Sequence, residues 1–225
     1  MLIPISWIPL ALPIWNLTLD VISIIMFMVH FETSVFPTLS GTASPDFCLS
    51  ISLFSTNMFV TLVLSLFCLY FWYFHATHRD EYPLTSKALK IIVFCASSIY
   101  ILGCSTLTIF YYADYPNIHI IGAYTHFASS LIILAIIIFT DMKLEKPKLV
   151  HYGRIACLPI ICIGMIITFC INEFTDRTKV SEQNILAWAE YILIITDMIT
   201  LGSVRWNVQQ IELVIGEEDQ KISSS

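Results

Sequence analysis

The chain has 225 residues and a formal net charge of −6; 57% of its residues are hydrophobic and only 12% are charged. Soluble domains carry about 25% charged residues, so this composition excludes an ordinary soluble globular protein. The acidic balance also excludes the basic surface of a typical nucleic-acid-binding protein. The composition therefore predicts a membrane protein with no nucleic-acid partner.

Six apolar stretches follow one another along the chain, and each approaches or exceeds the roughly 20 residues that a membrane-spanning helix needs. They cover residues 7–30, 47–74, 88–111, 118–140, 155–171 and 185–204. The first stretch is too long for a signal-peptide core and has no Lys or Arg before it, so we interpret it as a span. The sequence predicts an all-α fold: one bundle of six transmembrane helices in residues 1–212, then a short polar tail at 213–225.

Positive charge is concentrated in alternate connections. The connections after the second, fourth and sixth stretches hold Arg79, Lys87, Lys90, Lys143, Lys146, Lys148, Arg154, Arg205 and Lys221. The opposite side has only Arg177 and Lys179. Because Lys and Arg favour the cytosolic side, both termini are predicted to face the cytosol and the first, third and fifth connections the lumen or the outside.

Ionisable residues inside spans are costly unless they are paired or hydrated, which makes them functional candidates. Asn16, Asp20 and Ser23 share one helix face of the first span, and Glu190 and Asp197 share one face of the sixth. Counting residues puts Asp20 and Asp197 near the midplane. These faces are expected to point into the bundle, where the two carboxyl groups either bond across it as protonated acids or belong to a proton pathway.

His119 and Glu190 lie at a similar depth near the predicted lumenal surface. A histidine oriented by a carboxylate could act in acid–base catalysis, although the pair could equally lock the fourth span to the sixth. His126 lies two turns deeper on the same face as His119, but this spacing is weak evidence for zinc, so no metal or other cofactor is expected. The seven cysteines show no metal-binding spacing, and pairing of Cys48 with Cys170 stays open.

Several short strings resemble one family in order and spacing. The sixth span and the segment after it contain Glu190-Tyr191, Thr196-Asp197-Met198, Trp206-Asn207 and Glu212-Leu213; the remaining strings are His30-Phe31-Glu32, Phe36 to Ser40, Phe47 to Ser50, Asp114-Tyr115, Ile118-His119 and Ala128 to Leu131. The chain is similar to the Frag/DRAM/Sfk family of six-span membrane proteins, and most of all to its branch of glycosylphosphatidylinositol (GPI) anchor remodelling factors. Asp197 and Asn207 depart from that branch, each by an Asn/Asp exchange.

The resemblance implies replacement of a fatty acid on GPI-anchored proteins at the lumenal leaflet of the Golgi, with the endoplasmic reticulum and lysosome as alternative membranes. GPI-anchored proteins and membrane lipid would be the substrates, with a possible acyl donor. The resemblance leaves open whether the protein is an acyltransferase or an obligatory partner of one. His119 and Glu190 are the catalytic candidates, and His30, Glu32, Asn16, Asp20 and Asp197 are candidates for substrate binding or a structural polar network.

Two other functions are compatible with the sequence. A non-enzymatic regulator of autophagy or phosphoinositide signalling, like other family members, would work through the cytosolic segments 75–90, 143–148 and 205–212, although basic loops of this kind also simply contact anionic lipid. A proton-coupled carrier would use Asp20 and Asp197, with Pro159 and Gly164 as nearby helix breakers.

Overall fold

The computed structural model describes residues 2–4, 7–32, 37–42, 48–78, 87–142, 148–174, 180–208 and 212–214. In these segments, six long helices confirm the predicted spans, and each is long and apolar enough to cross a membrane. They are α1 (Ile8–Phe31), α3 (Cys48–His78), α4 (Lys87–Ile109), α5 (Pro116–Asp141), α6 (Lys148–Phe174) and α7 (Val180–Ser203). Two four-residue helices, α2 (Leu39–Thr42) and α8 (Arg205–Val208), lie between and after them.

Local sequence explains where two of the long helices begin and where α1 ends. Proline occupies the first turn of α1 and of α5, where its fixed φ suits a helix and its missing N–H costs nothing. α1 ends at Phe31, and the next residue, Glu32, caps it with a left-handed φ of 48° and a backbone N–H that donates to the carbonyl of Met28. Pro13 and Pro159 lie inside α1 and α6, a position that membrane helices tolerate.

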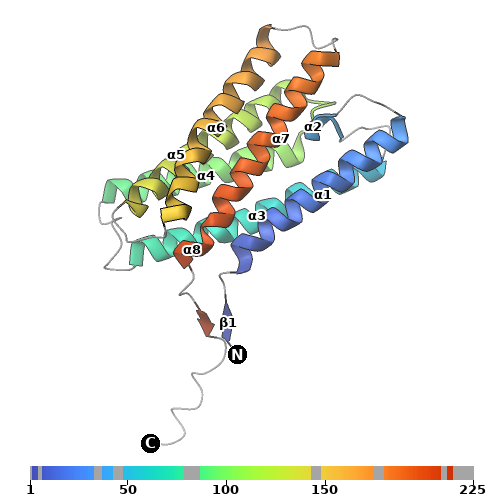
Figure 1. Ribbon diagram of the computed structural model, residues 1–225. Helices are drawn as coiled ribbons and strands as arrows, with labels where there is room; N and C mark the ends of the chain where they lie inside the picture. Colours follow the sequence, from blue (N-terminus) through green and yellow to red (C-terminus); the bar gives the residue numbers. More distant parts are fainter. Residues whose placement is uncertain are drawn as a thin grey trace, which may run out of the picture.

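The six long helices form a ring in chain order, which α7 closes by packing on α1 (Figure 1). The most extensive contact joins α4 to α5, and α7 also reaches α3 and α5 across the ring. Accordingly 56% of the α7 span and 50% of the α5 span are buried, against 28% of α1. The helices that carry His119, His126, Glu190 and Asp197 are therefore the innermost ones.

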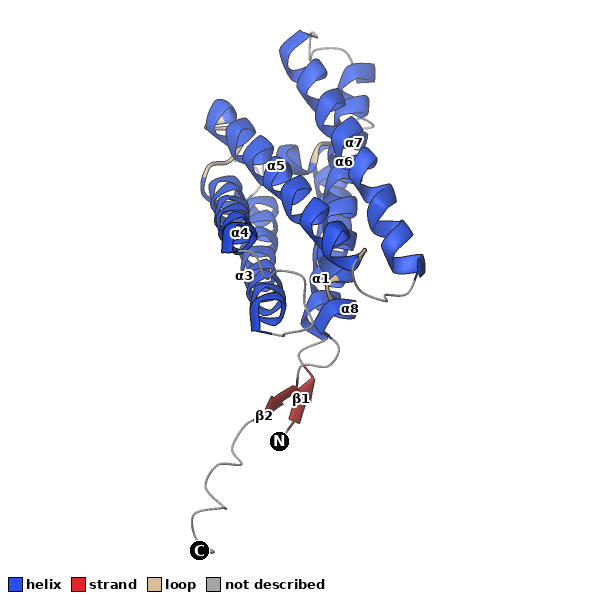
Figure 2. Ribbon diagram, turned by 90° about the vertical axis from the view of Figure 1, so that its left-hand side faces the viewer, coloured by secondary structure: helices blue, strands red, loops and turns tan. Residues whose placement is uncertain are grey.

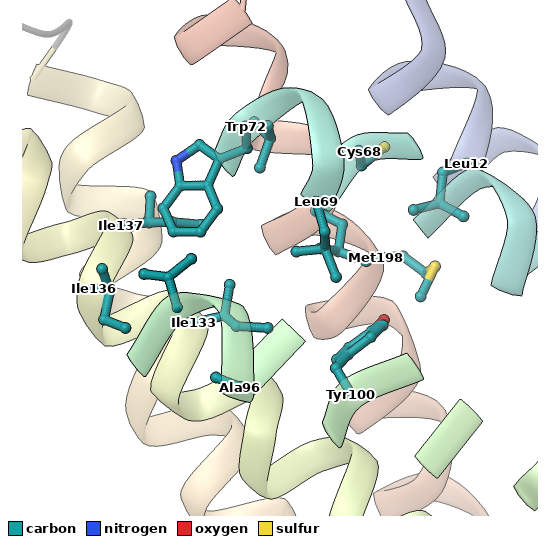
Figure 3. Packing of buried hydrophobic residues seen from close by; sticks show 13 residues of the cluster. Leu12, Cys68, Leu69, Trp72, Ala96, Tyr100, Ile133, Ile136, Ile137 and Met198 are labelled. Carbon is teal, nitrogen blue, oxygen red and sulfur yellow. The ribbon is translucent and has the colours of Figure 1, made fainter. Parts of the chain in front are cut away.

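The main apolar core draws on five of these helices. Leu12, Cys68, Leu69, Trp72, Ala96, Tyr100, Ile133, Ile136, Ile137 and Met198 meet in one cluster (Figure 3). Small residues allow close crossings at its edge: a Cβ on Gly103 of α4 would lie 2.6 Å from the backbone nitrogen of His126 on α5. Such close approach through small residues is typical of helix packing in membranes.

Two three-residue strands lie outside the bundle, β1 (Leu2–Pro4) and β2 (Glu212–Val214), and pair antiparallel with Leu2 opposite Val214 (Figure 2). This pairing brings residues 2–4 and 212–214 together at the end of the bundle opposite α2 (Figure 1). β2 spans the predicted boundary between bundle and tail, and residues 215–225 of that tail lie outside the described residues. The cytosolic side of the termini stays a prediction.

Arg154 lies inside α6, and the prediction that it lies at the end of a polar connection is wrong. α6 begins at Lys148, so Arg154 is within the helix, and it is only 2% exposed. Its Nε donates to Ser203 Oγ at 2.8 Å and its Nη2 to the Ser203 carbonyl at 2.6 Å. A cation at the C-terminus of α7 binds carbonyl groups that lack helical partners, which explains why the charge is tolerated there.

Cys170 has a free thiol, so it forms no disulfide.

Candidate functional site

Three side chains from distant parts of the chain meet at the end of the bundle that carries α2. Ser40 comes from α2, His119 from the first turn of α5 and Glu190 from the middle of α7; together we call them the Ser40 cluster. Ser40 Oγ lies 2.9 Å from His119 Nε2 and 2.6 Å from Glu190 Oε1. His119 and Glu190 therefore lie close together, as predicted, but the hydroxyl of Ser40, which was not among the predicted site residues, connects them.

The hydrogen bond of its Nδ1 atom fixes the orientation of the His119 ring. Nδ1 lies 2.7 Å from the carbonyl oxygen of Phe110, where the chain turns between α4 and α5. A carbonyl oxygen only accepts hydrogen bonds, so Nδ1 must carry a hydrogen. In the neutral imidazole, Nε2 is then the basic nitrogen, and it faces the Ser40 hydroxyl. His119 is only 3% exposed, so this contact is shielded from bulk water.

Two consecutive residues of α7, Glu190 and Tyr191, bind the segment around Ser40. Glu190 Oε1 also accepts the backbone N–H of Ser40 at 3.1 Å, and the Tyr191 hydroxyl donates to the Pro37 carbonyl at 2.9 Å. Thr38 stabilises the turn itself, because its Oγ1 accepts the N–H of Gly41 at 2.9 Å. Serine and threonine oxygens often bind backbone N–H groups in this way at helix starts. These bonds keep the Ser40 hydroxyl beside His119.

A cavity of about 450 Å³ lies inside the ring of helices, and all three members of the Ser40 cluster line it. Pockets for small molecules typically measure about 300–1,000 Å³ and have mainly apolar walls. Here the apolar walls include Phe54, Met58, Leu107, Phe127, Leu193 and Ile194. The cavity therefore combines an apolar space with polar groups at defined positions, which suits an amphiphile with a hydrocarbon chain.

A second polar group, the Asp197 cluster, lies deeper in the bundle and consists of Asp197, Tyr100, His126 and Ser130. The Tyr100 hydroxyl donates to Asp197 Oδ2 at 2.8 Å, and the Ser130 hydroxyl donates to Oδ1. His126 Nε2 lies 3.3 Å from Oδ2. His126 and Asp197 line the same cavity, and His126 Nδ1 is buried without a hydrogen-bond partner. The cluster binds α4, α5 and α7 together.

The polar face of α1 bonds to α3. Asn57 Nδ2 donates to Asp20 Oδ1 at 2.6 Å, and Asn16 Nδ2 donates to Thr61 Oγ1 at 3.0 Å. Asn16, Asp20 and Ser23 are buried, as their spacing predicts. An amide and a hydroxyl of α3, rather than a second carboxyl group, bond to Asp20 and Asn16.

Two of the remaining candidate residues, His30 and Glu32, lie away from both clusters. His30 and Glu32 are exposed at the end of α1, where the His30 ring lies edge-on to Phe31, and neither lines the cavity. His119 and His126 belong to different clusters. The described segments contain no group of three or more residues that could hold a metal ion. The sequence feature that could have identified Ser40 is its position in the string Phe36 to Ser40, one of the strings that resemble the family.

The fold and the cavity define a polytopic helical membrane protein whose helices surround a mainly apolar cavity with two buried polar clusters in its wall. A family model described as the Frag1/DRAM/Sfk1/Cwh43P N-terminal domain matches residues 4–211, which is nearly the whole chain. The chain therefore belongs to this family, as its sequence indicates. The comparisons found no matching curated protein and no matching solved structure.

Proposed function

We propose that the protein is a lipid-remodelling factor that takes part in replacing a fatty acid on GPI anchors at the lumenal leaflet of the Golgi membrane. Within its family it would then belong to the branch of post-GPI-attachment-to-proteins factor two. Its substrates would be GPI-anchored proteins and membrane lipid, with an acyl donor. A role as an obligatory partner of an acyltransferase would use the same cavity to hold the lipid.

One observation supports this proposal most: the basic nitrogen of His119 lies 2.9 Å from a hydroxyl oxygen in the wall of a mainly apolar cavity. Acyl transfer needs a base for a hydroxyl group and an apolar space for the acyl chain, and the cavity supplies both. The Ser40 cluster also lies at the end of the bundle that the distribution of positive charge predicts to face the lumen, and GPI anchors occupy the lumenal leaflet. Neither feature is needed for a regulator that works through its cytosolic loops.

The test is the acyl-chain composition of GPI anchors, measured by mass spectrometry in cells that lack this protein and in cells given it back. Loss is expected to shift the anchors from saturated chains to unsaturated or lyso forms, and the wild-type chain is expected to restore them. Unchanged anchors would refute the proposal and leave the regulator of autophagy or phosphoinositide signalling as the function to examine.

Glu190→Gln and His119→Ala are expected to abolish that rescue while the protein still reaches its membrane, because both remove proton-transfer groups from the Ser40 cluster. Glu173→Gln is the matched control, since Glu173 is exposed near the end of α6. Rescue by Glu190→Gln and by His119→Ala would show that the cluster has no catalytic part in remodelling.

A further inference from the structure

We propose that Ser40 is the nucleophile of a two-step acyl transfer and carries the acyl chain as a covalent ester between the steps. This inference rests on the proposed remodelling function and adds its chemical route. The starting observation is that the Ser40 hydroxyl has two close partners, a basic nitrogen on one side and a carboxyl oxygen on the other. Nucleophilic serine in enzymes is activated in this way by an adjacent base.

The two short contacts determine how many hydrogens the cluster holds. Ser40 Oγ lies 2.9 Å from His119 Nε2 and 2.6 Å from Glu190 Oε1, and each contact needs one hydrogen between its heavy atoms. The serine supplies only one. The second comes either from Glu190 as a carboxylic acid, beside a neutral His119, or from His119 as an imidazolium, beside a Glu190 carboxylate.

Both arrangements have zero net charge, as a site within a membrane span requires if no further counter-ion is present. They differ only by the transfer of one proton from Glu190 through the serine hydroxyl to His119. The cluster therefore contains a base and an acid on opposite sides of one hydroxyl. This is the pair of groups that acyl transfer uses, one to remove a proton from the attacking oxygen and one to protonate the leaving oxygen.

In the first step, Ser40 Oγ attacks the carbonyl carbon of an acyl ester or acyl thioester, and its proton passes to His119 Nε2. The bond between the carbonyl carbon and the donor's oxygen or sulfur breaks, and the leaving group takes the proton of Glu190. The products are the acyl ester of Ser40, the free donor alcohol or thiol, imidazolium and carboxylate.

In the second step, the hydroxyl oxygen of the lyso-lipid attacks the ester carbonyl, and its proton passes to the Glu190 carboxylate. The bond to Ser40 Oγ breaks, and the serine oxygen takes back its proton from His119. All three side chains return to their starting forms.

The cavity supplies the space for such an intermediate. Ser40 lines the cavity together with apolar side chains from α3, α4, α5 and α7, so a chain esterified to Ser40 has an apolar space to occupy. The hydrogen bonds from Ser40 N–H and from the Tyr191 hydroxyl hold the backbone of this segment on α7. The hydroxyl is therefore held in position before any donor binds, which favours reaction.

The test uses the purified full-length protein in detergent, mixed with alkynyl-palmitoyl phosphatidylcholine in one arm and alkynyl-palmitoyl-CoA in the other. After the alkyne is coupled to a fluorophore, the wild-type protein is expected to show a label that resists neutral hydroxylamine but not strong base, as an oxygen ester does. The arm that gives the label identifies the donor as a phospholipid ester or a thioester. No hydroxylamine-resistant label in either arm would overturn the covalent route.

Three variants of the Ser40 cluster and one control variant test where the label forms. Ser40→Ala is expected to reduce it to background, and Ser98→Ala is the matched control because the exposed Ser98 only donates to a carbonyl of its own helix. Ser40→Cys, which also shows that the site tolerates substitution, is expected to give a label that hydroxylamine removes. His119→Asn is expected to slow labelling by about 10²–10⁴-fold, the usual contribution of a general base. An unchanged label in Ser40→Ala would overturn the proposal.

Rescue of GPI anchors in cells separates this inference from the function on which it rests. If Ser40→Ala restores saturated anchors in cells that lack the protein, the covalent route is wrong and the remodelling function stands. If loss of the protein itself leaves the anchors unchanged, the remodelling function is wrong, whatever the label shows.

Discussion

At the scale of single residues, many of the buried polar side chains are bonded to helices other than their own, while several buried threonines donate to a carbonyl of their own helix. Asp197 is the clearest case, because it is fully buried and accepts hydrogen bonds from Tyr100 of α4 and Ser130 of α5. Polar groups in the apolar interior of a membrane protein are costly unless they find such partners. The Asp197 cluster therefore specifies how α4, α5 and α7 pack.

Exchanges at Asp197 test whether this cluster depends on hydrogen bonding or on charge. Asp197→Asn is expected to change thermal stability little, because an amide can accept one hydroxyl and donate to the other, and the remodelling branch of the family has Asn at this place. Asp197→Leu, similar in size, leaves two buried hydroxyls unpaired and is expected to lower the free energy of unfolding by roughly 1–3 kcal/mol for each. Melting of both purified variants in detergent measures the difference. Equal loss in the two variants would contradict the hydrogen-bond interpretation.

At the scale of elements, α4 and α5 form the closest pair in the bundle, and their contact determines where His126 lies. The crossing depends on glycine, since a Cβ on Gly103 would approach the backbone of His126 to 2.6 Å and a Cβ on Gly122 would approach Thr106 to 2.9 Å. The obstacle at Gly103 is backbone, which cannot rotate away as a side chain can. Separation of the two helices is then the only response.

Gly103→Ala is therefore expected to destabilise the protein by about 1–3 kcal/mol, the usual cost of overpacking. Gly153→Ala is the matched control, because a Cβ there meets nothing within 4 Å and alanine favours a helix over glycine by about 1 kcal/mol. Thermal melting of the two purified variants compares them. Equal stability of Gly103→Ala and the wild type would show that α4 and α5 are less tightly packed than this structure has them.

At the scale of the whole molecule, the ring of helices surrounds the cavity, and the strands β1 and β2 lie together at one end of the bundle (Figure 1). An even number of spans requires the two termini to share a side of the membrane. The distribution of positive charge predicts that this side is the cytosol, and α2 and the Ser40 cluster would then face the lumen.

Epitope tags at the two termini test this topology. After selective permeabilisation of the plasma membrane with digitonin, antibodies are expected to reach both tags, because both would face the cytosol. A tag at residue 177, in the connection between α6 and α7, is expected to become accessible only after the internal membranes are opened. Protection of both terminal tags would invert the orientation and remove the Ser40 cluster from the lumenal leaflet.

The sequence by itself determined the number of spans, their approximate bounds and their inward-facing polar positions. These properties are local: a bilayer needs about 20 apolar residues per helix, and burial of Asn16, Asp20 and Asp197 follows from helical spacing and the cost of polar groups in lipid. Depth counting even brought His119 and Glu190 to one level.

Which of these groups are in contact depends on the tertiary structure. Ser40 lies in a connection with no periodic pattern, and it reaches partners 79 and 150 residues away because α2 folds back onto α7. The sequence places Arg154 next to a polar connection, but in the structure its guanidinium binds the end of α7. Contacts of this kind depend on the packing of distant segments, which composition and spacing along the chain do not encode.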